Sequence, residues 1–250
     1  MARRSVRLLA AVLCVFTLLA ALTGCGGEKA AQLKTGKKLM KDYLSGLGRG
    51  AALLDSHVDV LRPDADKLVP SDYVKGTFRA GGAEYEFTVD TVTGEIYTSE
   101  RLAELTERLT ARIASRLGLR PEACVADCLM ELWKPAWHEV RSEWPWERAY
   151  LGEVLPVSVT DMDAYAAQVL ADADARVLLF LACRDSELYD GRWTAGDLAD
   201  WDAVEVQLFG FAPDEPLPDP ETFPTDYIYA SDRTRVTLTP EQVDFRAAAQ

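Results

Sequence analysis

Polar and apolar residues alternate without a break from Glu84 to Asp90, which is the pattern of a strand with one buried face. Gly81-Gly82 stands just before this segment, and two residues at φ > 0 are what a type I′ hairpin turn requires. Folding the chain there predicts an antiparallel hairpin over residues 73–89. The register brings three pairs onto one face: Val74 with Val89, Gly76 with Phe87 and Phe78 with Tyr85.

A third strand and a helix are predicted after the hairpin. Gly94 suits the last position of a type I turn, and Ile96-Tyr97 begins the next strand. Residues 102–117 then carry an apolar residue at every third or fourth position, which predicts an amphipathic helix that packs on Phe87. The stripe consists of Leu102, Leu105, Leu109, Ile113 and Leu117.

The second half of the chain mixes both kinds of pattern. Residues 121–133 predict another helix, because Pro121 suits a first helical turn. Val177–Ala182 is continuously apolar, which predicts a central strand covered on both faces, and alternation over 204–208 predicts a further strand.

The C-terminal segment is dominated by turn-forming residues. Five prolines among acidic residues make 212–224 a predicted surface loop. Residues 227–238 predict a hairpin, and residues 239–242 open a short terminal helix. Together the patterns predict an α+β fold, with antiparallel sheets and packed helices.

The N-terminus follows a different pattern. Three arginines within the first seven residues precede an apolar run from Leu8 to Leu22, in which Thr17 is the one polar residue. Charged, apolar and small residues in this order are typical of a secretory signal peptide, and the run is short for a membrane-spanning helix. Residues 1–24 are therefore predicted to be removed on export.

The four residues at the end of this segment, Leu22-Thr23-Gly24-Cys25, resemble the lipobox of bacterial lipoproteins. In that family the chain is cut before the cysteine, whose thiol carries a diacylglycerol. The resemblance implies a lipid anchor on Cys25 at the extracytoplasmic face of the cell membrane, and two acyl chains hold a protein there stably. An ordinary cleaved signal peptide, with Cys25 unmodified, is the alternative.

Net charge narrows the class of partner. The chain has 27 basic and 40 acidic residues, a net charge of −13, and loss of the three leader arginines makes it −16. A surface of this sign repels nucleic acid and anionic lipid headgroups. We therefore expect no nucleic-acid partner, and attachment to the membrane through lipid rather than through charge.

Residues 25–36 are small, polar and aperiodic, so they are predicted to form a tether between the lipidated cysteine and the body. Residues 37–47 then predict a short helix with one apolar side.

This helix, the hairpin and the segment Phe87–Ile96 resemble PepSY-type domains, which are small antiparallel domains of secreted bacterial proteins. The resemblance covers about residues 37–98 and carries over no catalytic residue. We accordingly expect one domain over 37–120 and an α+β body over 121–250, which contains the acidic loop 212–224.

Three cysteines other than Cys25 remain in the mature chain. Cys124 and Cys128 stand one turn apart in a predicted helix, and a bond between them would strain that helix. In an oxidising compartment we expect one of these two to bond Cys183, while the other stays a buried thiol. A zinc site would need a fourth ligand, for which His138 is the only nearby histidine, so we predict no metal and no cofactor.

Aromatic residues concentrate between positions 133 and 150. Four of them are tryptophans, namely Trp133, Trp137, Trp144 and Trp146. Such clusters line sugar sites and protein-binding grooves, and they also close small cores. We interpret the segment as mainly core, with a binding platform as the alternative.

The sequence contains no phosphate loop, dinucleotide fingerprint, nucleophile elbow or metalloprotease motif, and only two histidines. These features favour a lipoprotein with a non-catalytic binding role, whose partner is an envelope protein or a glycan. A carboxylate-dependent hydrolase of glycans or peptidoglycan is the main alternative, because the acidic residues could include its catalytic pair. A solute receptor ranks third, since two large α/β lobes are not evident.

Overall fold

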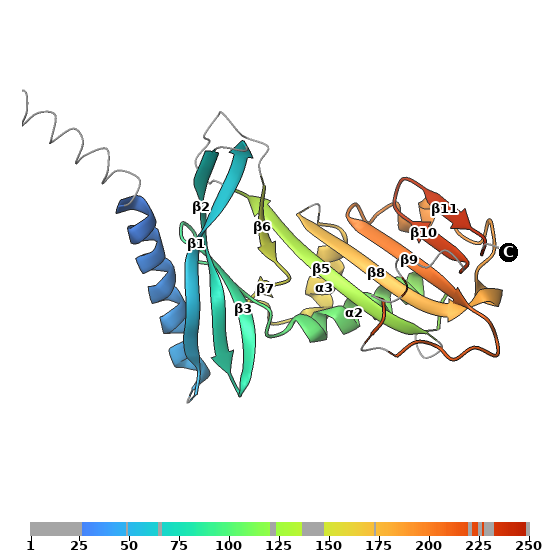
Figure 1. The fold of residues 1–250 in the computed structure, drawn as a ribbon, viewed down its shortest axis with the longest axis horizontal. Coiled ribbons are helices and arrows are strands. Elements are labelled where there is room, and N and C mark those ends of the chain that lie inside the picture. The colour runs from blue at the N-terminus through green and yellow to red at the C-terminus, as the bar shows by residue number, and fades with distance from the viewer. Residues whose placement is uncertain are drawn as a thin grey trace, which may run out of the picture. The chain divides into compact units, whose positions relative to one another are not determined.

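The computed structural model describes residues 27–48, 50–64, 67–120, 124–136, 148–172, 174–219, 222–224, 227 and 233–248. The chain has the predicted α+β fold, with helices and two mostly antiparallel sheets of five and six strands (Figure 1). It divides into two compact units, residues 1–96 with 136–147 and residues 97–135 with 148–250.

The first unit begins with a helix over residues 27–47, which lies along one face of three long strands (Figure 1). The helix starts ten residues before the predicted start, so the predicted tether is wrong over 27–36. Alanine, lysine and glutamine in this stretch favour a helix. Gly36 lets it approach the sheet closely, because a Cβ atom there would lie 2.6 Å from the Cβ of Val74.

The hairpin has the predicted register. Gly76 lies opposite Phe87, and Gly81 and Gly82 have φ angles of 59° and 90°. Gly76 also lets the neighbouring bulged strand approach closely. A Cβ atom at this position would lie 2.1 Å from the carbonyl oxygen of Asp55 on that strand. The three strands are β1 (Ala52–Asp64), β2 (Lys67–Ala80) and β3 (Ala83–Asp90).

Phe87 is 1 % exposed, as a core position requires, but its predicted partner is wrong. It packs with Met40 and Leu44 of the N-terminal helix rather than with Leu105 and Leu109. Both helices carry an apolar stripe, and the spacing of a stripe does not identify the surface that it covers.

Two short strands complete the five-stranded sheet, whose order is β1-β2-β3-β4-β7. The predicted strand at Ile96-Tyr97 is confirmed as β4 (Ile96–Thr98). Its partner β7 (Leu155–Pro156) pairs antiparallel to it.

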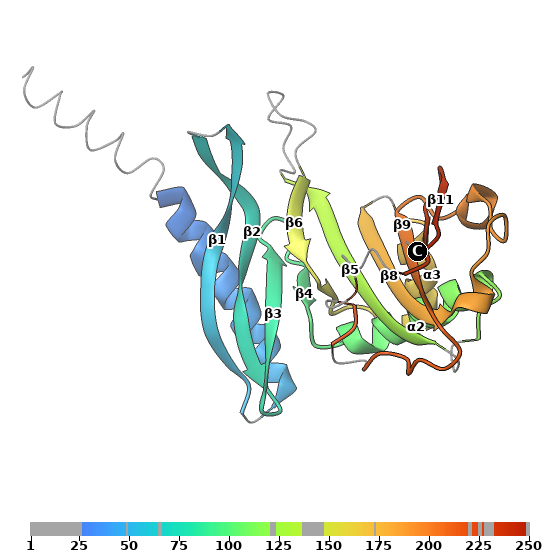
Figure 2. The same cartoon turned by 45° about the vertical axis from the view of Figure 1, so that its right-hand side comes forward.

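The second unit contains the six-stranded sheet in the order β11-β10-β9-β8-β5-β6, in which β8 and β9 are parallel. Helices α2 (Leu102–Arg116) and α3 (Met162–Leu170) lie behind this sheet in both views (Figures 1 and 2). The predicted stripe of α2 is confirmed, because Leu105, Leu109 and Ile113 are each fully buried. The strands are β5 (Val125–Pro135), β6 (Arg148–Gly152), β8 (Ala175–Arg184), β9 (Val204–Phe211), β10 (Arg235–Leu238) and β11 (Val243–Arg246).

The helix predicted up to Trp133 is wrong where the structure describes it. Residues 125–135 form strand β5, which lies between β6 and β8. Cys128, Met130 and Leu132 are buried on one face of that strand. The alternation of apolar and polar residues that marks a strand is short here. Val125 and Ala126 are both apolar, so the alternation begins only near Cys128.

The predicted central strand is confirmed as β8, and both of its faces are covered. Helices lie on one side, while the acidic loop places Phe223 against Phe180 and Phe209 on the other. Two 3-10 turns, Asp185–Glu187 and Ala195–Leu198, follow β8.

Two arginines fix the start of the acidic loop. Arg184 donates to the carbonyl oxygens of Ala212 and Glu215 at 2.7 and 2.6 Å. Arg233 binds the Glu215 carboxylate and lies 4.0 Å above the Phe211 ring, measured from its guanidinium carbon. The guanidinium group holds the pKa of Glu215 below its usual range. The loop that the prolines predict therefore lies at the surface and also covers one face of β8 and β9.

The predicted C-terminal hairpin and terminal helix are wrong where the structure describes them, and residues 228–232 of the hairpin lie outside the described residues. Strand β10 pairs with β9 on one side and with β11 on the other, so the last hairpin turns at residues 239–242. Thr239 accepts hydrogen bonds from the backbone N–H groups of Glu241 and Gln242. A threonine turn of this kind has the same sequence signature as a helix N-cap, which explains the error.

Candidate functional site

The residues predicted for anchoring and for an aromatic platform lie mostly outside the described residues. Cys25, Trp137, Trp144 and Trp146 belong to this group. Trp133 is described on β5, where its half-buried ring lies 5.0 Å from the ring of Tyr150 on β6, between centroids. That single aromatic pair is what the structure shows of the predicted platform.

The three remaining cysteines belong to the second unit, and none of them forms a disulfide in the structure. Cys128 is 3 % exposed and hydrogen-bonded to the side chain of Thr110, and its burial raises the pKa of the thiol to about 12. Burial also raises the pKa of Cys183 to about 12. Thiols with such pKa values are poor nucleophiles at neutral pH.

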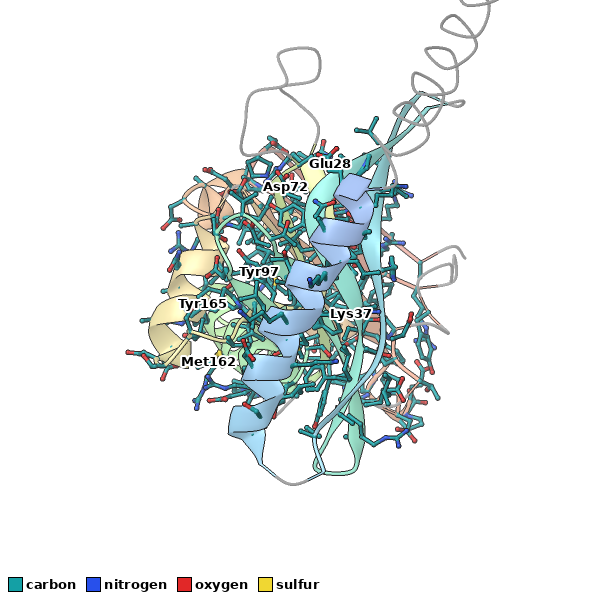
Figure 3. The ribbon with its side chains drawn as sticks, turned by 90° about the vertical axis from the view of Figure 1, so that its left-hand side faces the viewer. Glu28, Lys37, Asp72, Tyr97, Met162 and Tyr165 are labelled. Atoms are coloured by element: carbon teal, nitrogen blue, oxygen red, sulfur yellow. The ribbon has the colours of Figure 1, made fainter. Side chains whose placement is uncertain are left out.

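A row of lysines marks the outer side of the N-terminal helix. Met40 and Leu44 point into the core, whereas Lys34, Lys38 and Lys41 are exposed on the opposite side, and Lys37 is half-buried. Figure 3 looks onto this side of the helix, with Lys37 labelled and the strands behind it. The four lysines line a shallow groove of about 510 Å³ together with Ala30, Leu33 and Asp42.

The charge of this helix is opposite to that of the chain as a whole. Residues 27–47 contain five lysines and two acidic residues, while the full chain has a net charge of −13. No described residue lies within ion-pair distance of the four outward lysines. Their charge is therefore available to a partner.

A second basic surface lies on α2. Arg108, Arg112 and Arg116 recur at intervals of four residues, so they share one side of the helix, which flanks the stripe of buried leucines. They line a groove of about 450 Å³ together with Ala111, Ser115, Asp163 of α3 and Trp201. All of these residues belong to the second unit.

The protein itself fixes two of these guanidinium groups. Arg116 binds the Asp200 carboxylate, donates to the carbonyl oxygen of Asp197 at 2.8 Å and lies 5.1 Å from the Trp201 ring centroid. Hydrogen bonding to Arg116 lowers the pKa of Asp200. Arg112 donates to the carbonyl oxygen of Asp163 at 2.9 Å.

Arg108 is held less completely. Its Nε atom is buried and has no hydrogen-bond partner among the described residues, because the nearest carboxylate oxygen, on Asp163, is 3.8 Å away. A buried donor without an acceptor is costly. Fixed guanidinium groups beside an aromatic ring suit a planar carboxylate or a phosphate.

One carboxyl group in the described part of the chain has a clearly raised pKa. Burial raises the pKa of Asp127, which lies on β5 opposite Phe180 of β8. A hydrolase of the predicted kind would need a second carboxylate across the scissile bond.

Within the described ranges, no group of three or more histidine, cysteine or acidic side chains could hold a metal ion. No helix in the same ranges is both long and apolar enough to cross a membrane. Comparisons with protein-family models, curated proteins and solved structures found no significant match to the chain.

Sequence reasoning missed both basic surfaces. The arginine spacing was readable from the sequence, since residues four apart share one side of the helix that was already predicted. The lysine row was hidden by the net negative charge of the chain, which describes the average surface and not a particular helix.

Proposed function

We propose that the protein is a lipid-anchored lipoprotein of the bacterial envelope, held by Cys25 at the extracytoplasmic face of the cell membrane, with a non-catalytic binding role. The anchor is supported by the sequence Leu22-Thr23-Gly24-Cys25 after a signal-like segment. The binding role is supported by one structural observation above all, the arginine groove on α2.

The groove favours an anionic ligand. Three guanidinium groups and one tryptophan gather on a chain with 13 more acidic than basic residues, and one buried donor lacks an acceptor. Arginine matches carboxylates in a two-bond geometry that lysine cannot reproduce. Peptidoglycan fragments carry free carboxylates and belong to the predicted glycan class of partner.

The lysine row gives the membrane a second contact. The helix starts two residues after Cys25, so its lysines would lie near the headgroups if the helix ran along the membrane surface. Each lysine close to an anionic surface contributes about 1 kcal/mol at most, and the acidic remainder of the chain opposes this attraction. We therefore assign the lysines to orientation of the protein and the lipid to its attachment.

Binding can be tested by calorimetry of the soluble chain, residues 26–250, with soluble peptidoglycan fragments. We expect measurable binding that the double variant Arg108→Gln/Arg112→Gln weakens about tenfold or more. Arg79→Gln is the control for loss of an arginine outside the groove, since it removes one positive charge from an exposed residue that pairs with Glu84. Equal affinity of the double variant and the control would remove the groove from the proposal.

The alternative, a carboxylate-dependent hydrolase, rests on Asp127 and its raised pKa. Incubation of the same fragments with the protein, followed by chromatography of the products, separates the two functions. Turnover that Asp127→Asn abolishes would replace the binding role with catalysis.

A further inference from the structure

Two of the three cysteines stand where β5 begins and β8 ends: Cys124 directly precedes β5, and Cys183 is the last residue but one of β8. In the antiparallel pair β5–β8, Val125 lies opposite Ala182, and the same register continues without a shift to Leu132 opposite Ala175. One step beyond Val125 in that register sets Cys124 opposite Cys183. Side chains of opposed residues point to the same face of a sheet, so this extended register would turn both thiols to one face. Cys124 is also near enough to contribute to the raised pKa of the Cys183 thiol.

Distance distinguishes the two pairings that the sequence leaves open. Opposed residues in an antiparallel pair have Cα atoms about 4.5–5.5 Å apart, inside the range of about 4.4–6.8 Å that a disulfide spans. Cys128 lies opposite Leu179, four residues along β8 from Cys183. At about 3.3 Å per residue this offset is about 13 Å, which no disulfide bridges without backbone movement.

We propose that Cys124 and Cys183 form a cross-strand disulfide in the exported protein, and that Cys128 remains a thiol. The inference rests on the proposed function in one respect, because it assumes export to a compartment that contains a disulfide donor.

The bond would form by thiol–disulfide exchange with an oxidised dithiol protein. The thiolate of Cys124, the more exposed of the two residues, attacks one donor sulfur, and the other donor sulfur leaves as a thiolate. The thiolate of Cys183 then attacks the Cys124 sulfur of the mixed disulfide, and the second donor sulfur leaves. Two electrons pass to the donor, and the two protons from the cysteines neutralise the donor thiolates.

The surroundings of the pair suit a structural bond rather than a catalytic one. Cys183 is 1 % exposed, and burial together with the nearby Cys124 sulfur raises the pKa of its thiol to about 12. Reductants and attacking thiolates need access to a sulfur atom, so the folded protein would protect the bond once it has formed. Formation would therefore precede the final burial of Cys183.

Peptide mapping of the full chain from exporting cells tests the pairing. Cells are quenched in acid, thiols are blocked, and the protein is digested without reductant by trypsin and a protease that cuts before aspartate. Cleavage before Asp127 separates Cys124 from Cys128, so each pairing gives a different linked peptide. We expect a link between the peptides of Cys124 and Cys183, which Cys124→Ser abolishes and Cys128→Ser preserves.

Counting free thiols before and after reduction distinguishes failure of the disulfide proposal from failure of the lipidation proposal. The disulfide predicts that reduction exposes two additional thiols, whether the precursor is cut and lipidated or not. Failure of lipidation would instead change both counts together, because Cys14 and Cys25 would remain as thiols.

A second arm tests the geometry without export. The purified soluble chain, residues 26–250, is unfolded, reduced and refolded in a buffer of oxidised and reduced glutathione. We expect the same Cys124–Cys183 link, and little reduction of it by glutathione until urea unfolds the chain. A Cys128–Cys183 link, or three blocked thiols in protein from cells that oxidise an exported control protein, would overturn the proposal.

Discussion

The two helices with basic outer faces differ in what surrounds their charges. On the N-terminal helix, the outward lysines have no ion-pair partner among the described residues, while on α2 the arginines bind carboxylates, carbonyl oxygens and a tryptophan ring. A compact, hydrated and mobile ammonium group favours a diffuse charged surface, whereas a fixed guanidinium plane favours a ligand of definite shape. Similar numbers of charges therefore point to a membrane surface in one region and a bound anion in the other.

The contrast also bears on the expectation that net charge keeps the body of the protein away from anionic headgroups. Averaged over the mature chain, a net charge of −16 predicts repulsion from anionic headgroups. The helix nearest the anchor has the opposite sign, and electrostatic interactions fade over about 8–10 Å at physiological salt. The sign of the nearest surface matters more at that range than the sign of the total.

We expect the largest effect from a variant that removes the proposed anchor and leaves both helices in place. Cys25→Ala deletes the thiol that we propose carries the lipid, and lysines alone cannot replace two acyl chains. We expect the uncut precursor to accumulate or the mature chain to leave the membrane fraction. Fractionation of cells expressing the variant measures this, and mature-sized Cys25→Ala protein that stays membrane-bound would refute lipidation.

The next largest effect tests what each helix covers. Phe87→Ala should destabilise the first unit by about 3–5 kcal/mol and Leu109→Ala the second by about 2–5 kcal/mol, since both residues are fully buried. Urea melts of residues 26–250 measure the loss, with Glu86→Ala as a control that should change stability by no more than about 0.5 kcal/mol. If Glu86→Ala cost as much as Phe87→Ala, the inward and outward faces of β3 would be reversed.

The sequence was sufficient to predict the β2–β3 hairpin, because the turn residues and the alternation of polar and apolar residues indicate the same structure. Gly81-Gly82 defines a turn that admits few alternatives, and one turn fixes the register of β2 and β3. The segment before Trp133 lacked such a constraint. Residues four apart, such as Cys124 and Cys128, share a face in a helix and in a strand alike, so their spacing could not distinguish the two.

The candidate site depends on residues that no local pattern connects. The arginines of α2 were readable from their spacing, but Asp163 and Trp201 reach the groove from later parts of the chain. Only the packing of α3 and the turn after Leu198 brings them there. The opposed position of Cys124 and Cys183 likewise required the pairing of β5 with β8.

A smaller effect tests whether the lysines of the N-terminal helix contact the membrane independently of the lipid on Cys25. The soluble chain should sediment weakly with vesicles that contain anionic lipid at low ionic strength, and not with neutral vesicles. Replacement of Lys34, Lys37, Lys38 and Lys41 by glutamine should abolish this binding without changing the urea midpoint, because the four side chains have no described ion-pair partner. Arg79→Gln is the control for loss of charge elsewhere. Unchanged vesicle binding of the fourfold variant would remove the membrane role of the helix.

The smallest expected effect is a pH dependence that α2 has and the lysine row lacks. Hydrogen bonding to Arg116 lowers the pKa of Asp200 in the folded protein. A carboxyl group whose pKa is lower when folded adds stability above its unfolded pKa, and this contribution disappears as the pH falls through the folded pKa.

Wild type should therefore be slightly more stable than Arg116→Gln at neutral pH, and the difference should close as the solution becomes acidic. Asp200 is exposed, so solvent screening keeps the effect small. Urea midpoints of both proteins, measured at a series of pH values from 7 downward, test this, with Lys38→Gln as a comparison that should show no such closing gap. A constant difference between wild type and Arg116→Gln would mean that Arg116 stabilises the fold through its contact with Trp201 rather than through the carboxylate.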